Sequence, residues 1–232
     1  GTAGSTTLVL QTILPALMMA DAPSEVSLEG GTHNPTAPPF DFLKHAFLPL
    51  VERMGPKVVL SLDRYGFFPA GGGRIRAHIT PSVDLAPLQL LGGGKLSSYR
   101  VRALVAHLPK HIGTRECNTI ARKLSWSERN CSVESVLNSD GPGNVLLVEA
   151  DRADVTEVFA GFGERGVQAE KVAAGVAREI RRYLQADVPV GEHLADQLLL
   201  PMGIAAHRFG SRSEYRTLAL SAHTRTHIDV LQ

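Results

Sequence analysis

Apolar and polar residues in the first 91 positions repeat with two periods, one typical of helices and one typical of strands. The helical period predicts a helix that Ser5 or Thr6 can cap, and a second helix over 40–55 that contains Pro49. The alternating period predicts three short strands, at 25–31, 57–64 and 74–81. Strands and helices are thus mixed from the start of the chain.

The rest of the chain continues this mixture. The clearest helix spans 167–184, where Val172, Val176, Ile180 and Leu184 recur at every fourth position. Further helices are expected at 114–126, 190–203 and 222–232, and strands at 99–109, 131–137, 145–150, 155–163 and 214–221. Because strands and helices do not alternate regularly, the pattern indicates an α/β fold of the mixed α+β kind, with mixed sheets.

Two connections suggest how the chain is divided. A glycine-rich stretch at 92–94 resembles a linker, and a second turn near 186–190 returns toward the first part. We therefore expect a smaller domain over 92–185, inserted into a larger domain formed by 1–91 and 186–232.

Composition narrows the class of protein. The chain has 232 residues, 44% apolar and 20% charged, so it can bury a core. It shows neither a leader-peptide pattern nor an apolar run long enough to cross a bilayer, and we expect a cytoplasmic protein (nuclear in a eukaryote) with no membrane partner. Cys117 and Cys131 are expected to be reduced core thiols.

The net charge of +1 gives no overall attraction for nucleic acid, but one stretch is basic. Positions 205–227 contain one acidic residue, Glu214. The same stretch contains four arginines and three histidines: Arg208, Arg212, Arg216, Arg225, His207, His223 and His227. Either a solvated surface or a local patch that binds nucleic acid fits this composition.

Two places carry candidate chemistry. His193, Asp196 and Gln197 fall at i, i+3 and i+4 on one face of a predicted helix, which is either an ordinary polar face or a surface that binds a nucleobase. His223 lies at a predicted strand-to-helix junction, either as a surface or capping residue or as a nucleophile toward phosphorus. His223 and His227 match a metal pair only weakly, so no metal ligand is assigned.

The stretch "RYGFFPAGGG" (64–73) places three glycines after an apolar run. Glycine gives up the most backbone freedom on folding, so the triplet needs a reason. One reason is a turn packed closely against its neighbours, and the other is a loop that exposes N–H groups to phosphate.

Four blocks in order resemble the RNA 3'-terminal phosphate cyclase family: "EGGTHNPTAPPFDFL", "RYGFFPAGGG", "GEHLADQLLLPM" and "SAHTRT". The family signature R-x-G-x-x-P-x-G-G-G is matched at Arg64, Gly66, Pro69 and Gly71–Gly73, and the resemblance covers essentially the whole chain. It implies a large domain of repeated βαβαββ units, each a four-stranded sheet with two helices, and a smaller inserted α/β domain.

The resemblance also implies an activity and its participants. The family uses ATP and a divalent cation, Mg or Mn, to convert an RNA 3'-terminal phosphate into a 2',3'-cyclic phosphate through a covalent histidine–AMP. His223 matches the nucleophile. The positions expected to contact the nucleotide are Pro38 and Phe42 around the adenine, His193, Asp196 and Gln197 over the base and ribose, and Gln11 on the first helix.

Some positions depart from the family pattern. An early glycine-rich segment and a metal-binding glutamate have no match, and the family continues beyond the point where this chain stops, so we expect part of a longer protein. His193 lies where members can carry tyrosine, and His227 lies where asparagine is frequent.

Two other functions stay open beside the cyclase. One is a relative without catalytic activity that binds RNA or assembles with ribosomal precursors, and the other is a small-molecule transferase on a similar repeat fold. His223 separates the first alternative from the enzyme, because such relatives have lost the nucleophile. The signature stretch argues against the second.

Overall fold

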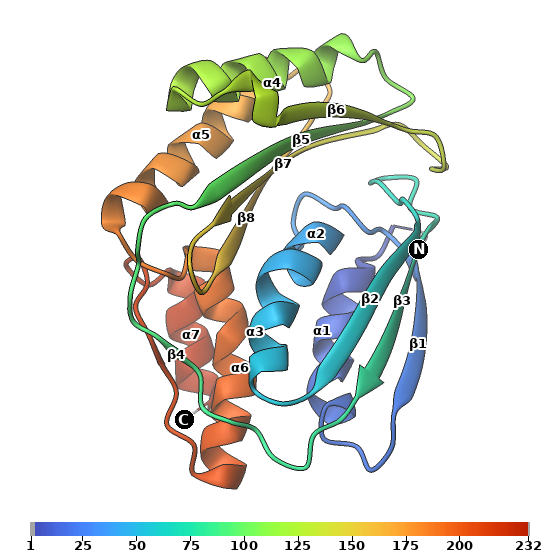
Figure 1. The fold of residues 1–232 in the computed structure, drawn as a ribbon. Helices are drawn as coiled ribbons and strands as arrows, with labels where there is room; N and C mark the ends of the chain where they lie inside the picture. Colours follow the sequence, from blue (N-terminus) through green and yellow to red (C-terminus); the bar gives the residue numbers. More distant parts are fainter. Residues whose placement is uncertain (1–2, 232) are drawn as a thin grey trace.

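The computed structural model describes residues 3–231. The first layer is a three-stranded antiparallel sheet, and the helix α1 (Thr6–Leu17) packs against it (Figure 1). Its strands lie in the order β1 (Ser24–Gly30), β3 (Gly73–Thr80), β2 (Lys57–Arg64). Ser5 caps α1 as expected, because its Oγ accepts a hydrogen bond from the N–H of Leu8 at 3.2 Å.

The expected helix over 40–55 is present but is not a uniform α-helix. It begins as α2 (Phe40–Phe42), widens into a π-helical turn (Leu43–Phe47) and ends as α3 (Leu48–Arg53). Pro49 lies at the start of α3, where the missing N–H of proline costs least. The α3 segment of this helix contacts β2 of the three-stranded sheet.

A second sheet has four strands and is mixed, as the sequence predicts. Its order is β6 (Cys131–Val136), β5 (Ser98–Ala106), β7 (Gly143–Asp151), β8 (Thr156–Phe162). The β5–β6 pair is parallel and the other pairs are antiparallel. Two helices, α4 (His111–Leu124) and α5 (Ala169–Ala186), cover one face of this sheet (Figure 1).

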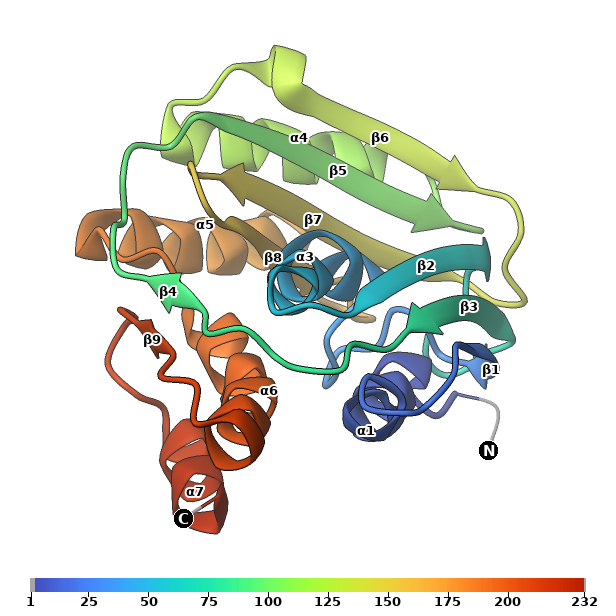
Figure 2. The ribbon, with the colours of Figure 1, turned by 60° about the horizontal axis from the view of Figure 1, so that its bottom comes forward.

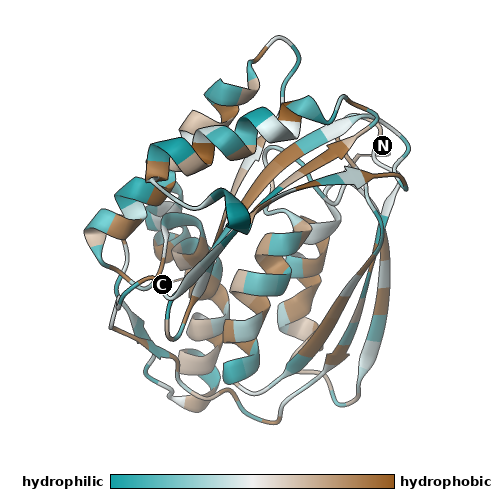
Figure 3. Cartoon of the chain, turned by 45° about the horizontal axis from the view of Figure 1, so that its top comes forward, coloured by the Kyte–Doolittle hydropathy of each residue, from teal (hydrophilic) through white to brown (hydrophobic). Residues whose placement is uncertain are grey.

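The two faces of the four-stranded sheet pack into different cores. On the helix-covered face, Val101, Leu146 and Ile180 belong to a core of their own. On the opposite face, Leu104 and Leu147 join the larger core that contains the α2–α3 helix. Figure 3 shows hydrophilic residues along the outer sides of the helices over this sheet. The 98–186 unit is therefore covered on both faces.

The last part of the chain returns to the larger core. It comprises α6 (Glu192–Phe209), β9 (Glu214–Tyr215) and α7 (Ala222–Leu231), and Figure 2 shows α7 beside α6. The strand predicted over 214–221 is wrong beyond Tyr215. Its ladder partner β4 (Gln89–Leu90) is two residues long, and beyond it only a single bridge between Thr217 and Val190 follows in the described part of the chain. A strand that continued to residue 221 would leave its backbone groups unpaired.

A cluster of charges connects α2 to the four-stranded sheet. Asp41 of α2 accepts hydrogen bonds from Nε2 of His33 at 2.9 Å and from Arg102 of β5. Glu149 of β7 lies 3.6 Å from the same guanidinium. Burial alone would raise the pKa of the Asp41 carboxyl, but the His33 hydrogen bond and the charges of His33 and Arg102 hold that pKa well below its usual range.

The glycine triplet forms a closely packed turn between β2 and β3. Gly71 and Gly72 have φ values of 69° and 68°, which favour glycine. A Cβ atom on Gly73 would lie 2.5 Å from the backbone nitrogen of Gly66 and 2.7 Å from Cγ2 of Thr32. The geometry therefore favours the packed-turn explanation of the triplet.

The structure shows the mixed α/β class that the sequence predicts. The described residues contain one αβαββ run, from α1 to β3, so the repetition of βαβαββ units and the domain boundaries stay predictions. None of the helices within residues 3–231 is both long enough and apolar enough to cross a membrane.

Candidate functional site

Three helices that are distant in sequence enclose a cavity of about 490 Å³. Its walls come mainly from α1, α6 and α7, with Phe47 of the π-helical turn, and its volume falls within the range of ligand pockets, roughly 300–1,000 Å³. We call it the α1–α6–α7 cavity. Its polar residues with ring nitrogen, amide or carboxylate groups are Gln11, Asp196, Gln197, His223 and His227.

His223 and Asp196 form the polar centre of this cavity. His223 is in the first turn of α7, which Ser221 caps by accepting a hydrogen bond from the N–H of Thr224 at 3.0 Å. Nδ1 of His223 lies 3.0 Å from Oδ1 of Asp196 on α6. The imidazole side chain is 80% exposed and the carboxylate side chain 10% exposed, so a ligand can reach the ring.

The contact fixes which ring nitrogen is free. An ionised carboxylate can only accept hydrogen bonds, so the bond requires the proton on Nδ1 of His223. A neutral imidazole then keeps a lone pair on Nε2, the atom that Asp196 does not contact. The arrangement leaves a nucleophilic nitrogen in a fixed orientation at the edge of the cavity.

His227 contacts the same carboxylate oxygen. Its Nδ1 lies 3.3 Å from Oδ1 of Asp196, one turn after His223 on α7. The sequence indicated this residue as part of the basic stretch and, through its i, i+4 spacing from His223, as half of a weak metal pair. The structure instead makes it a second hydrogen-bonding neighbour of Asp196.

Two glutamines connect α1 to α6 across the cavity. Nε2 of Gln11 donates to Oε1 of Gln197 at 2.5 Å, and Nε2 of Gln197 lies 3.4 Å from Oδ2 of Asp196. Oε1 of Gln11 is buried and has no hydrogen-bond partner among residues 3–231. An unpaired buried acceptor is costly, and a ligand with an N–H or O–H donor would satisfy it.

Two prolines leave the backbone carbonyls of these glutamines available as further acceptors. Pro15 of α1 and Pro201 of α6 line the cavity and have no N–H. They cannot donate to the carbonyls four residues earlier, which belong to Gln11 and Gln197. Both glutamines therefore have backbone carbonyls that lack their usual helical donor.

Comparison with known proteins identifies the family. A family model described as "RNA 3'-terminal phosphate cyclase" matches residues 1–232. The chain belongs to this family. Its membership agrees with the resemblance carried by the signature stretch and by the block around His223.

Individual relatives carry the same name. Proteins named "RNA 3'-terminal phosphate cyclase" from Koribacter versatilis and from Ectopseudomonas mendocina are 47% and 45% identical over 232 residues. A relative of the same name from Pseudomonas fluorescens is 47% identical. The alignments cover all of this chain but 64% of the first relative and 66% of the other two, so the chain spans just under two thirds of their length.

Three residues that the cyclase family resemblance places around the nucleotide do not line the cavity. Pro38 is half-buried, and its carbonyl accepts from Oγ1 of Thr7 at 2.7 Å. Phe42 is 3% exposed and packs in the core. His193 is exposed on the first turn of α6. Their role in nucleotide binding stays a prediction.

The basic stretch is not one uniform surface. Arg216 donates to the carbonyl of Leu91 at 3.0 Å, so it ties the end of the chain to the linker. Arg208 lies over the ring of Phe209, 5.8 Å from its centroid. Arg225 is exposed on α7, two residues after His223, and is the arginine of the stretch closest in sequence to the candidate nucleophile.

No divalent-cation site is assigned among residues 3–231. Asp41, His45 and Glu149 bring ligand atoms within 4.8 Å of one another, but His33 and Arg102 already bind both oxygens of Asp41. The α1–α6–α7 cavity offers one carboxylate and two imidazoles, not the oxygen-rich set that Mg²⁺ prefers.

Proposed function

We propose that this protein uses ATP to convert the 3'-terminal phosphate of an RNA into a 2',3'-cyclic phosphate, with His223 as the carrier of the adenylyl group. The observation that carries the proposal is the exposed ring of His223, whose Nδ1 is held by Asp196. Family membership supports the same reaction.

The first step forms a phosphoramidate on His223. The Nε2 lone pair attacks the α-phosphorus of ATP, and the bond between that phosphorus and the bridging oxygen breaks. Pyrophosphate leaves with the electron pair. Positive charge develops on the ring, and the Asp196 carboxylate stabilises it through Nδ1–H.

The next two steps move the adenylyl group and close the ring. An oxygen of the RNA 3'-phosphate attacks the α-phosphorus, and the bond to Nε2 of His223 breaks. The neighbouring 2'-hydroxyl then loses its proton to solvent and attacks the 3'-phosphorus, and AMP leaves with the electron pair. Adenylylation supplies the leaving group that a phosphate dianion lacks, and the vicinal hydroxyl gains from proximity.

ATP fits the polar groups of the α1–α6–α7 cavity. Gln11 and Gln197 offer acceptors to N–H or O–H donors of a nucleoside, and Arg225 offers charge near the phosphates. Pro38, Phe42 and His193 complete the nucleotide site that the family resemblance implies. Mg²⁺ or Mn²⁺ would neutralise phosphate charge, and we place the reaction in the cytoplasm.

The alternative function is RNA binding without catalysis. The same family membership is compatible with it, but a binding module has no need for an exposed imidazole oriented by an almost buried carboxylate. The His223–Asp196 pair therefore favours the enzyme.

The test uses a short RNA with a 3'-phosphate, ATP, Mg²⁺ and purified protein that contains residues 1–232. We expect the RNA end to become resistant to phosphatase, with release of AMP and pyrophosphate, and we expect His223→Ala to lose both outcomes. RNA that binds but stays sensitive to phosphatase would support the non-catalytic alternative instead.

A further inference from the structure

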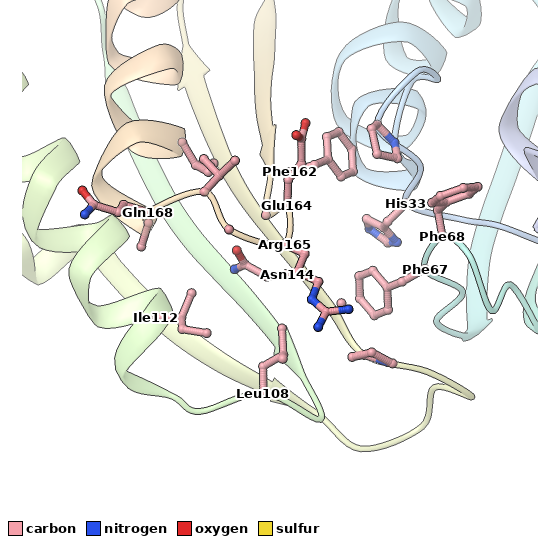
Figure 4. A pocket seen from close by; sticks show the side chains of 18 of the residues that line it. His33, Phe67, Phe68, Leu108, Ile112, Asn144, Phe162, Glu164, Arg165 and Gln168 are labelled. Atoms are coloured by element: carbon pink, nitrogen blue, oxygen red, sulfur yellow. The ribbon is translucent and has the colours of Figure 1, made fainter.

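A second cavity, of about 1140 Å³, lies between the signature stretch and the four-stranded sheet (Figure 4). One wall comes from the loop that contains Phe67, Phe68 and Pro69, and the opposite wall from the starts of α4 and α5. It shares no lining residue with the α1–α6–α7 cavity. Its size exceeds the usual range for one small ligand, roughly 300–1,000 Å³, so it has room for part of a polymer.

The signature wall offers an aromatic surface. Phe68 is 62% exposed, which is unusual for such a large apolar side chain. The preceding residue, Phe67, is buried and stacks with Tyr65 at 6.1 Å between ring centroids, which anchors this loop. The exposed ring of Phe68 on the cavity wall offers an aromatic face on which a nucleobase can stack.

The opposite wall offers positive charge and N–H donors. Arg165, in the loop between β8 and α5, has no ion pair within the described part of the chain, and Figure 4 shows its side chain inside the cavity. α4 and α5 both begin here, and neither has a side-chain cap. Ile112 donates to the carbonyl of Pro109 and Lys171 to that of Gln168, so the other N–H groups of these first turns are the ones that can bind an anion. Glu164 is the acidic residue on the lining.

We propose that this cavity binds a single-stranded segment of the substrate RNA, upstream of the 3'-terminal phosphate. A nucleic-acid strand presents a flat base and an anionic phosphate in every nucleotide. The aromatic wall suits the base, and the wall with Arg165 and the helix N-termini suits the phosphate. Recognition would be largely independent of sequence, because every base can stack. The inference rests on the proposed function for the identity of the strand.

The signature stretch gains a role from this proposal. Its glycines make the closely packed turn described above, and that turn holds Phe67, Phe68 and Pro69 against the cavity. None of these three residues lines the α1–α6–α7 cavity. A motif that marks the family would thus position the RNA strand rather than ATP.

The experiment measures binding of fluorescent RNA by anisotropy, without ATP, at several salt concentrations. Two ligands are compared, both with a 3'-phosphate: a dinucleotide and an RNA of about ten nucleotides. The test variants are Phe68→Ala and Arg165→Ala. The controls are Leu137→Ala and Arg129→Ala, which change exposed residues outside the cavity.

We expect each test variant to weaken binding of the longer RNA by about tenfold while the controls and the dinucleotide change little. Arg165→Ala should also lower the salt slope by about one. Unchanged affinity for the longer RNA in both variants would overturn the proposal. Equal weakening for the dinucleotide would also overturn it, because the residues would then act at the terminal phosphate.

This test can fail separately from the proposed function. Adenylylation of His223 needs no RNA, so we expect Phe68→Ala and Arg165→Ala to form the histidine–AMP at the normal rate with ATP and Mg²⁺. Loss of RNA affinity with intact adenylylation supports both proposals. Normal RNA affinity with intact adenylylation overturns only the second cavity's role.

Discussion

Nδ1 of His223 lies 3.0 Å from Oδ1 of Asp196, so an almost buried carboxylate on α6 orients an exposed imidazole on α7. The two residues are 27 positions apart. The contact gives the ring one free nitrogen and a counter-charge for the cation that would form on attack. Everything proposed about catalysis follows from this pair.

Asp196→Asn should keep the fold but lose that orientation. An amide can place its NH₂ group against Nδ1, which would move the proton to Nε2 and block the lone pair. We expect the rate of histidine adenylylation to fall roughly 100-fold or more, measured in a single turnover with labelled ATP. Asp229→Asn, a change to an exposed carboxylate on the same α7 helix, should leave the rate unchanged. Equal rates in the two variants would contradict the orienting role.

Gln11→Leu should weaken ATP binding more than it slows chemistry. The change removes the unpaired acceptor and the donor to Gln197, so one or two ligand hydrogen bonds are lost. We expect the KM for ATP to rise about tenfold, with a smaller change in kcat. Gln185→Leu, at the exposed end of α5, is the matched control. A fall in kcat at constant KM would place Gln11 in the chemical step instead.

The buried Asp41–Arg102 pair should matter for stability far more than a surface pair. Asp41→Asn leaves the Arg102 guanidinium without its main counter-charge, and we expect a loss of about 3–5 kcal/mol in the free energy of unfolding. Glu29→Gln, which breaks the exposed pair with Arg74, should cost less than about 1 kcal/mol. Urea denaturation followed by circular dichroism compares the two variants, and similar losses would show that the buried pair stabilises the fold no more than a surface pair does.

Glu116 should make the protein less stable as the pH rises. The residue is fully buried, and burial raises the pKa of its carboxyl from 4.5 to about 7, although the hydrogen bond from Asn144 lowers it. Below pH 4.5 the group is protonated in both states. Between pH 4.5 and 7 the unfolded state ionises first, so stability is lost by up to about 3 kcal/mol and stays low above that range.

Glu116→Gln tests this pH dependence. Relative to the wild type, the variant should gain stability between pH 5 and pH 8, as measured by denaturation at each pH. Glu128→Gln, at an exposed position, should follow the wild-type profile. A pH profile that is the same for Glu116→Gln and the wild type would show that this carboxyl does not titrate in the folded protein.

Local periodicity predicted the elements well because it depends only on neighbouring residues. The repeat of Val176 and Ile180 marked α5, and the face of Asp196 and Gln197 marked the polar side of α6. The strand expected after Tyr215 failed because a strand needs a partner, and β4 provides only two residues. No local pattern contains that information.

The candidate site could be predicted in part for the same reason. The family motif indicated His223, and spacing indicated Asp196, but only the packing of α7 against α6 shows that the two side chains meet. His227 was underestimated because its partner lies on another helix. The second cavity is assembled from loops of both sheets, so the exposed ring of Phe68 had no visible partner in the sequence.

The intact mass of the protein after incubation with ATP and Mg²⁺ tests the central claim most directly. We expect the protein to gain the mass of one AMP, in a linkage that acid cleaves and base does not, and His223→Ala to gain nothing while His227→Ala still reacts. An adduct of the same mass on His223→Ala, or no adduct on a wild-type protein that binds ATP, would contradict the account.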